Sequence, residues 1–252
     1  ESWIFPGEFP NRRLILIIRT VSEDGTMKER DFYLLQVNDA LFPVGGYSHS
    51  QGLETYIQKG LVRDERTAEE YIHNKLCWGL AYTELLAARL AWEAAEAGDT
   101  DALVRLEDIL EASRLPEEQR EAARKMGSRF AKTIEKLRLP ACENGIFRTF
   151  LERRKGRTVS HCCIYGVFCA CMEIDEESCL AHYLYAQTSA MVTNCVKTVP
   201  LSQSAGQALL SGCYQEFERL LAQVMDCTEE DLCLSAPGFD LRGIQHERLY
   251  SR

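Results

Sequence analysis

Cysteine and histidine gather in one apolar stretch of the sequence, where they could bind a metal ion. His161, Cys162 and Cys163 are consecutive, and Cys169 and Cys171 follow them closely. Zinc sites usually use Cys-x₂₋₄-Cys pairs, whereas this stretch offers Cys-Cys and Cys-x-Cys without a second matching pair. On a helix, Cys162 and Cys169 would share a face that the other thiols do not. The pattern therefore favours small apolar packing residues, and a metal site remains the alternative.

Two further patterns begin like catalytic motifs but lack a required residue. His246 and Glu247 open the His-Glu-x-x-His pattern of zinc proteases, yet Tyr250 stands where the second histidine belongs. The stretch Gly45–Ser48 has neither the Gly-x-Ser-x-Gly of a hydrolase nor the Gly-Lys-Ser/Thr of a nucleotide-binding loop. No pair of acidic residues stands out as a catalytic set. The sequence therefore predicts a protein that is not an enzyme, with no catalytic residues, metal ligands or cofactor.

The most unusual stretch, residues 42–54, lies between two apolar segments and holds three glycines. Glycine is favoured where φ is positive or where a backbone must come close to another group. Ser48 and Gln51 fit a capping box, so we predict a tight bend that leads into a helix over Gly52–Lys59. The surplus of glycine beside aromatic and charged residues indicates a binding surface. Its candidate residues are Gly45, Gly46, Tyr47, Ser48, His49, Ser50, Gly52 and Glu54.

Helical periodicity dominates the chain from Asp31 onward. Apart from the helix after the glycines, the predicted segments are 32–41, 67–98, 101–112, 117–139, 143–151, 160–172, 177–196, 200–225 and 228–233. A capping box at Thr67–Glu70 should open the longest of them, and Pro140 should end the segment that Pro116 begins. The apolar segments 160–172 and 177–196 should pair as the core. We expect one all-α domain over residues 31–252, a single helical bundle of about eight to ten helices.

Two stretches are expected to lie apart from this core. Residues 1–30 hold two prolines, a β-branched run and an Asp-Gly turn signal, which suggests a tail or appendage. The basic run Glu152–Arg157 should be a solvated loop.

Composition narrows the functional class. The net charge of −9 over 252 residues argues against non-specific binding of nucleic acid or anionic membranes. No apolar run approaches the roughly 18 to 20 residues that a membrane span needs. The 11 cysteines lie mostly inside helical segments, which is not the spacing of a disulfide framework. We therefore expect reduced thiols and a cytoplasmic protein.

A second candidate surface lies at the junction of two predicted helices, within residues 196–207. Lys197 should sit at the favourable C-terminal end of one helix, and Pro200 should start the next. Gln203 and Gln207 are spaced to share a face beside that cation. The pattern fits either ordinary helix ends or a face that recognises a partner.

The last 18 residues, 235–252, form a third candidate. Pro237 and Gly238 should break the preceding helix, and the apolar residues beyond them are too many for a free tail. They are also too few to stabilise an isolated helix in water. A docking element is therefore favoured over a frayed terminal helix. Its candidate contact residues are Asp240, His246, Glu247, Arg248 and Tyr250.

The three stretches together resemble the UreF family of urease accessory proteins. Residues 42–54 read Phe-Pro-x-Gly-Gly-Tyr-Ser-x-Ser-x-Gly-Leu-Glu, and stretches 196–207 and 235–252 follow in the family's order. The resemblance covers about residues 32–252. It implies an all-α homodimer without catalysis that binds the accessory protein UreD, called UreH in some organisms. It also implies recruitment of the GTPase UreG and GTP-dependent nickel delivery to apo-urease.

The resemblance further implies how the surfaces are shared between partners. The glycine stretch and the face of Lys197, Gln203 and Gln207 would meet UreG, and the end near Tyr250 would meet UreD. The alternative is a helical metal-binding protein or enzyme that uses the cysteine and histidine cluster at 161–171. Stoichiometric, tightly held metal in protein purified without chelator would favour that alternative.

Overall fold

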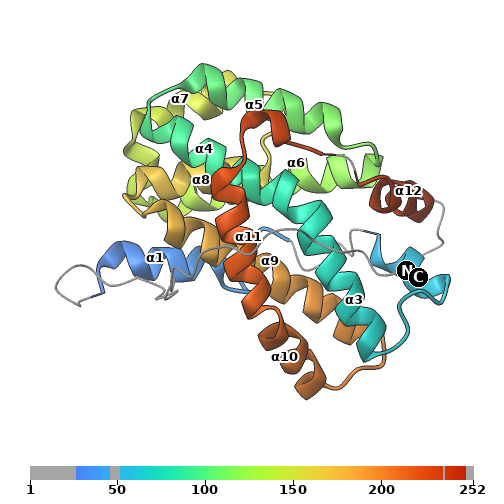
Figure 1. Ribbon diagram of the computed structural model, residues 1–252. Helices are drawn as coiled ribbons and strands as arrows, with labels where there is room; N and C mark the ends of the chain where they lie inside the picture. The colour runs from blue at the N-terminus through green and yellow to red at the C-terminus, as the bar shows by residue number, and fades with distance from the viewer. Residues whose placement is uncertain (1–26, 46–51, 235, 248–252) are drawn as a thin grey trace.

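The computed structural model describes residues 27–45, 52–234 and 236–247. These residues form one compact all-α body without a strand, as predicted (Figure 1). The first helices are α1 (Glu29–Asn38), α2 (Leu53–Gln58), α3 (Glu65–Lys75), the π-helix η2 (Leu76–Leu85), α4 (Leu86–Glu96), α5 (Thr100–Ser113) and α6 (Glu117–Leu137). They are followed by η3 (Pro140–Glu143), α7 (Gly145–Arg153), α8 (His161–Cys171), α9 (Glu176–Thr198), α10 (Gln203–Gly212), α11 (Tyr214–Asp226), η4 (Glu229–Asp231) and α12 (Pro237–His246).

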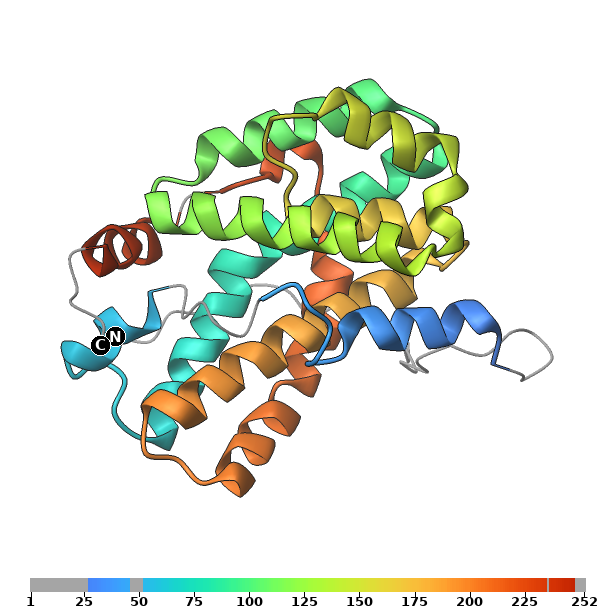
Figure 2. The ribbon, with the colours of Figure 1, turned by 180° about the vertical axis from the view of Figure 1, so that it is seen from behind.

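The centre of the body is α8, which is buried along nearly its whole length. Its most extensive neighbour is α4 (Figures 1 and 2), so the predicted pairing of segments 160–172 and 177–196 as the core is incomplete. α8 does contact α9, where the Tyr165 and Tyr183 rings lie 5.0 Å apart. Gly166 explains the close approach, because a Cβ there would lie 2.3 Å from the carbonyl oxygen of Ala88. Small residues on α4 and α8 therefore allow these two helices to pack closely.

The predicted long helix is present as one continuous rod of α3, η2 and α4. Its capping box lies one turn earlier than expected, since the Asp64 carboxylate accepts from the Thr67 amide at 2.9 Å. The Thr67 hydroxyl in turn accepts from the Asp64 amide at 3.1 Å. The predicted box at Thr67–Glu70 is therefore wrong, because Thr67 is the third residue of the helix rather than its cap.

Two prolines also act differently from the prediction. α10 does not begin at Pro200, because the Ser202 hydroxyl caps it by accepting from the Ala205 amide at 3.0 Å. Pro140 does not end α6, which stops at Arg138 in the left-handed conformation with φ 53°. Pro140 instead opens η3, where its missing N–H costs no hydrogen bond.

The basic run at 152–157 is only partly solvated, and the prediction fails at Arg154. Its side chain is fully buried and its Nε donates to the Thr158 carbonyl at 2.9 Å. The guanidinium also pairs with Asp108 and with Glu111 on α5, the latter at 3.2 Å. Arg154 thereby holds the α7–α8 connection against α5.

No helix in the described ranges is long and apolar enough to cross a membrane. The expected tail at residues 1–30 lies almost wholly outside the described residues, and α1 begins at Glu29.

Candidate functional site

The C-terminal helix α12 lies against α2 and the start of α6, and this junction unites two of the three sequence motifs. Figure 2 shows α12 at the N-terminal end of α6 and above α2. The Thr55 hydroxyl on α2 donates to the Arg242 carbonyl at 3.1 Å. Pro237 begins α12 as its first residue, so the expectation that Pro237 and Gly238 only break a preceding helix was incomplete. In the chain alone, α12 already packs on the protein's own helices.

Two glycines lie where α12 meets its neighbours, and the close packing requires one of them, Gly243. A Cβ at Gly52 would lie 3.5 Å from the Gly243 backbone, and Gly52 itself has φ 92°. A Cβ at Gly243 would lie 2.6 Å from the ring of Pro116 and 2.7 Å from the Gln119 amide. The backbone of α12 can therefore sit between α2 and α6 only because position 243 lacks a side chain. Gly52 was predicted as a site residue, whereas Gly243 was not.

His246 links α12 to both neighbouring helices. Its Nε2 lies 2.8 Å from Glu54 Oε2, and its Nδ1 lies 2.5 Å from Glu118 Oε2. Partial burial lowers the pKa of His246, but the bonds to Glu118 and Glu54 outweigh it, and the net pKa is raised. The next residue, Glu247, accepts a hydrogen bond from the Glu117 amide at 2.6 Å and so supplies an acceptor at the start of α6. The predicted residues Glu54, His246 and Glu247 thus belong to one network.

An aromatic contact continues the junction toward the rod. The Phe239 ring lies 6.0 Å from that of Tyr56 and 6.2 Å from that of Tyr71, measured between centroids. Lys75 Nζ lies 4.7 Å from the same ring, in the geometry of a cation–π contact. Burial lowers the pKa of Lys75, against the opposing influence of Glu84 and Asp240.

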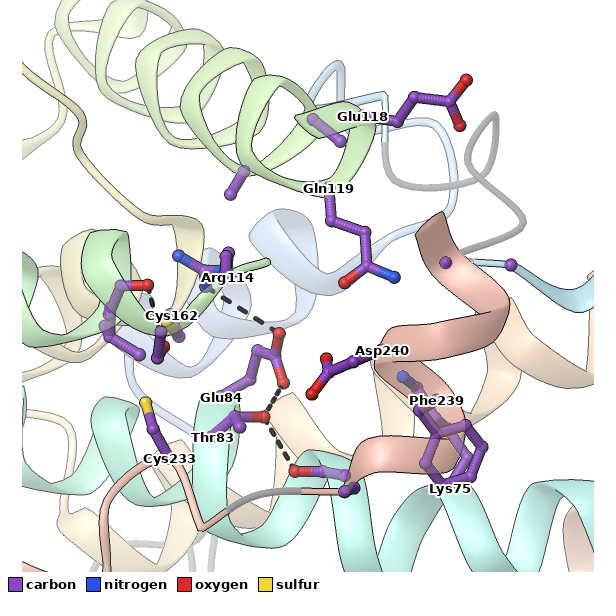
Figure 3. Close-up of a pocket in the computed structure, with 18 of the residues that line it drawn as sticks. Lys75, Thr83, Glu84, Arg114, Glu118, Gln119, Cys162, Cys233, Phe239 and Asp240 are labelled. Carbon is purple, nitrogen blue, oxygen red and sulfur yellow. Dashed lines mark hydrogen bonds and ion pairs between the residues drawn. The ribbon is translucent and has the colours of Figure 1, made fainter. Parts of the chain in front are cut away.

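Beside α12 the chain forms an open cavity of about 820 Å³. Figure 3 shows the Glu84 and Asp240 side chains pointing toward one another in it, with Arg114 on the far side of Glu84. An Arg114 nitrogen lies 3.8 Å from a Glu84 oxygen, and Arg114 also donates to the Ser160 hydroxyl at 2.9 Å. Burial raises the pKa of Asp240. The cavity is therefore lined by charges of both signs, of which the sequence had indicated Glu54, Asp240, His246 and Glu247 but not Glu84, Arg114 or Lys75.

His161 and Cys162 do not form a nucleophile–base pair in this cavity. His161 lines it next to Cys162, but neither ring nitrogen of His161 has a hydrogen-bond partner in the part of the chain that the structure describes. Burial lowers the pKa of His161 to about 4, so the ring is neutral near pH 7. A thiol nucleophile needs a hydrogen-bonded base, and this pair does not provide one.

The cysteines of the 161–171 stretch are packing residues. Cys162, Cys163 and Cys169 are buried in α8, and all 11 cysteines are free. Burial, followed by a hydrogen bond with Cys162, raises the pKa of Cys163. The structure brings a different cysteine together with possible metal ligands: Cys77 lies beside His73 and Glu216. The four-residue spacing of His73 and Cys77 was the signal in the sequence, but Glu216 could not have been assigned to them.

The second sequence motif forms a separate surface. Lys197 lies in the last turn of α9, as predicted, and it is exposed together with Pro200, Gln203 and Gln207. In Figure 1, α10 lies near the start of α3, away from α12. Among the described residues, no recorded hydrogen bond or ion pair joins this surface to α12.

Of the remaining predicted site residues, the structure describes only Gly45. Gly45, with φ 81°, is the last described residue before the gap. The predicted residues Gly46, Tyr47, Ser48, His49, Ser50, Arg248 and Tyr250 lie outside the described residues.

A comparison with models of known protein families gives a match to this chain. The family model described as UreF matches residues 62–214, which is more than half of the chain. The matched region runs from just before α3 into the start of α11, and so contains the rod, the buried helix α8 and the Lys197 surface. The chain therefore belongs to the UreF family, whose members are urease accessory proteins rather than enzymes.

Proposed function

We propose that this protein is an adaptor in urease maturation, which binds UreD (UreH) and recruits the GTPase UreG so that nickel is delivered to apo-urease. The observation that carries the proposal is the α2–α12 junction, where Glu54 and His246 from two distant motifs meet at 2.8 Å. Family membership supports the accessory role in general. The junction adds a specific surface on which a partner could act.

The outer face of α12 has the character of a docking surface for UreD. Leu241 and Ile244 are 51% and 39% exposed, one turn apart on the same helix. Charged groups are present at the same helix, because His246, two residues after Ile244, contacts Glu54 and Glu118. An apolar centre with a polar rim is the usual composition of a protein interface.

The Lys197 surface is the proposed contact for UreG. Lys197 contributes an exposed cation at the end of α9, and Gln203 and Gln207 contribute exposed amides at the start of α10. An adaptor couples to a GTPase only if its surface binds the nucleotide states with different affinity. A small polar surface with one charge can discriminate between the nucleotide states of UreG, because the UreG groups that face Lys197 would differ between those states.

We also propose a homodimer in the cytoplasm. Phe32 and Leu35 are exposed by 57% and 47% on α1, and Leu41 by 91% just after it, which offers apolar area to a second copy. The free state of all 11 cysteines supports a reducing compartment. Light scattering at micromolar concentration tests the dimer, and a monomer mass would contradict it.

Co-expression with tagged UreD, with and without UreG, tests the adaptor role. We expect the chain to co-purify with UreD, and UreG to join only when the chain is present. Capture of UreG by UreD in the absence of this chain would overturn the proposal. So would failure of the folded chain to bind either protein.

A further inference from the structure

Three potential metal ligands of different chemistry converge where α11 crosses the rod, outside the cavity and outside the α12 junction. His73 is in the last turn of α3, Cys77 is in η2 and Glu216 is in the first turn of α11. One ligand atom from each lies within 4.8 Å of the others. His73 and Cys77 are four residues apart on one helical rod, so their side chains share a face.

The distances between these atoms suit a small cation. Cys77 Sγ lies 3.9 Å from His73 Nδ1 and 3.0 Å from Glu216 Oε1. His73 Nδ1 lies 3.6 Å from Glu216 Oε2. Bonds of about 2.0 to 2.3 Å around a tetrahedral ion place its ligands roughly 3.3 to 3.8 Å apart. The triangle therefore needs only small side-chain adjustments to close around an ion.

The groups are also positioned for exchange with solvent. The His73 side chain is 51% exposed and that of Glu216 is 16% exposed, while Cys77 is buried at 7%. An ion could thus enter from the His73 side and be held against the thiol. The π-helix that carries Cys77 adds to the case, because π-helical turns are rare and often occur at functional sites.

In the absence of an ion, Arg219 balances the negative charge of Glu216. Its Nε lies 3.0 Å from Glu216 Oε1, and its Nη2 lies 3.5 Å from Cys77 Sγ. Cys77 itself donates its thiol proton to Glu216. Because the Arg219 side chain is 61% exposed, it can turn into solvent when a cation replaces it. Binding would release the thiol proton, and the thiolate and carboxylate charges would balance a divalent ion.

We infer that His73, Cys77 and Glu216 form a binding site for one divalent first-row transition ion of the Zn²⁺, Co²⁺ and Ni²⁺ class. Imidazole and thiolate favour these ions over Mg²⁺ and Ca²⁺, which prefer oxygen ligands alone. Three protein ligands leave a fourth position for water. A bound ion would fasten α11 to the rod. The inference does not depend on the proposed adaptor role, because it concerns only groups within this chain.

Cobalt titration tests the site, because a thiolate bound to Co²⁺ gives a sulfur-to-metal charge-transfer absorption. Full-length protein treated with chelator and then dialysed would be titrated with Co²⁺, followed by competition with Zn²⁺ and with Ni²⁺. We expect one Co²⁺ per chain with this absorption, displaced by either competitor. Cys77→Ser should abolish the band. His73→Ala and Glu216→Gln should each weaken binding at least about tenfold, since even outer-shell changes cost 10- to 100-fold.

Cys213→Ser is the matched control, because Cys213 is half-buried at the start of α11 and its thiol donates to the Leu209 carbonyl at 3.2 Å. It should keep the band unchanged. Arg219→Ala should bind Co²⁺ at least as tightly as the parent protein. If Cys77→Ser does not fold, the exposed His73→Ala variant decides the question. A parent protein without the band, or an equal band in His73→Ala, would overturn the inference.

Discussion

His246 on α12 and Glu54 on α2 are 192 residues apart in sequence and lie 2.8 Å apart in the structure. Each belongs to a different sequence motif, and each motif by itself could be explained as an ordinary helix end. Their contact makes one surface from the two motifs. It also adds the charge of one imidazole to the contacts that hold α12 in place.

The attachment of α12 should therefore weaken as the pH rises. The pKa of His246 is raised in the folded chain because its bonds to Glu118 and Glu54 outweigh its partial burial. A raised folded pKa means that the stabilisation is complete below the ordinary histidine pKa of about 6.5 and is lost as the pH rises through the folded value. Hydrogen exchange of the α12 amides across this range measures the effect. His246→Gln should remove the pH dependence, and an unchanged profile in that variant would contradict the prediction.

Gly166→Ala should destabilise the whole body. The new Cβ would meet the Ala88 carbonyl oxygen at 2.3 Å, and backbone atoms cannot give way as a flexible side chain can. Overpacking of this kind costs about 1 to 3 kcal/mol. The melting temperature should fall by several degrees. Gly212→Ala is the control, because nothing lies within 4 Å of its new Cβ, and it should leave melting equal or higher.

Charge reversal at the two proposed partner surfaces should impair urease activation without unfolding the protein. Glu54→Lys would remove a partner of His246 and place two cations together, while Lys197→Glu would reverse the exposed cation of α9. We expect complex formation with UreD and UreG to weaken at least about tenfold, or about 1.4 kcal/mol, in each variant. Pull-down and urease activation assays measure this. Glu152→Lys, an exposed change on α7, is the control. If both variants activate like the parent, neither position belongs to a partner surface.

Removal of Gly238–Arg252 should abolish binding of UreD and also lower the melting temperature. Phe239 covers Tyr56 and Tyr71, so its loss exposes apolar surface worth about 2 kcal/mol. Most of the other helices pack mainly against helices other than α12, so the helical circular dichroism should be nearly unchanged. A truncated chain that still binds UreD would refute the docking role. A truncated chain that loses its helicity would show that α12 belongs to the core.

The thiols should react in two classes. All 11 cysteines are free, and Cys162, Cys163 and Cys169 of α8 are buried, with the pKa of Cys163 raised by burial. Titration with a thiol reagent after denaturation should therefore find all 11, while the native protein should react more slowly and at fewer sites. Several native disulfides would contradict both the structure and the proposed cytoplasmic location.

Local features of this fold could be predicted because they depend on neighbours in sequence. Helical periodicity identified the long segment that becomes the rod, and Lys197 was correctly placed at the end of a helix. Cys162, Cys163 and Cys169 of α8 are buried, in agreement with the interpretation of this stretch as packing residues. Periodicity and capping act over one or two turns, so they are visible in the chain alone.

The tertiary structure decided which surfaces meet. The apolar faces of α8 and α9 are both evident in the sequence, but the fit of Gly166 against Ala88 selects α4 as the partner of α8. Arg154 lies in a basic run that resembles a loop, and only the carboxylates of α5 explain its burial. Glu216 reaches Cys77 across 139 residues, and His246 reaches Glu54 across 192. Periodicity specifies that a face is buried, whereas the neighbour is chosen by the shape and charge of surfaces that only the folded chain brings together.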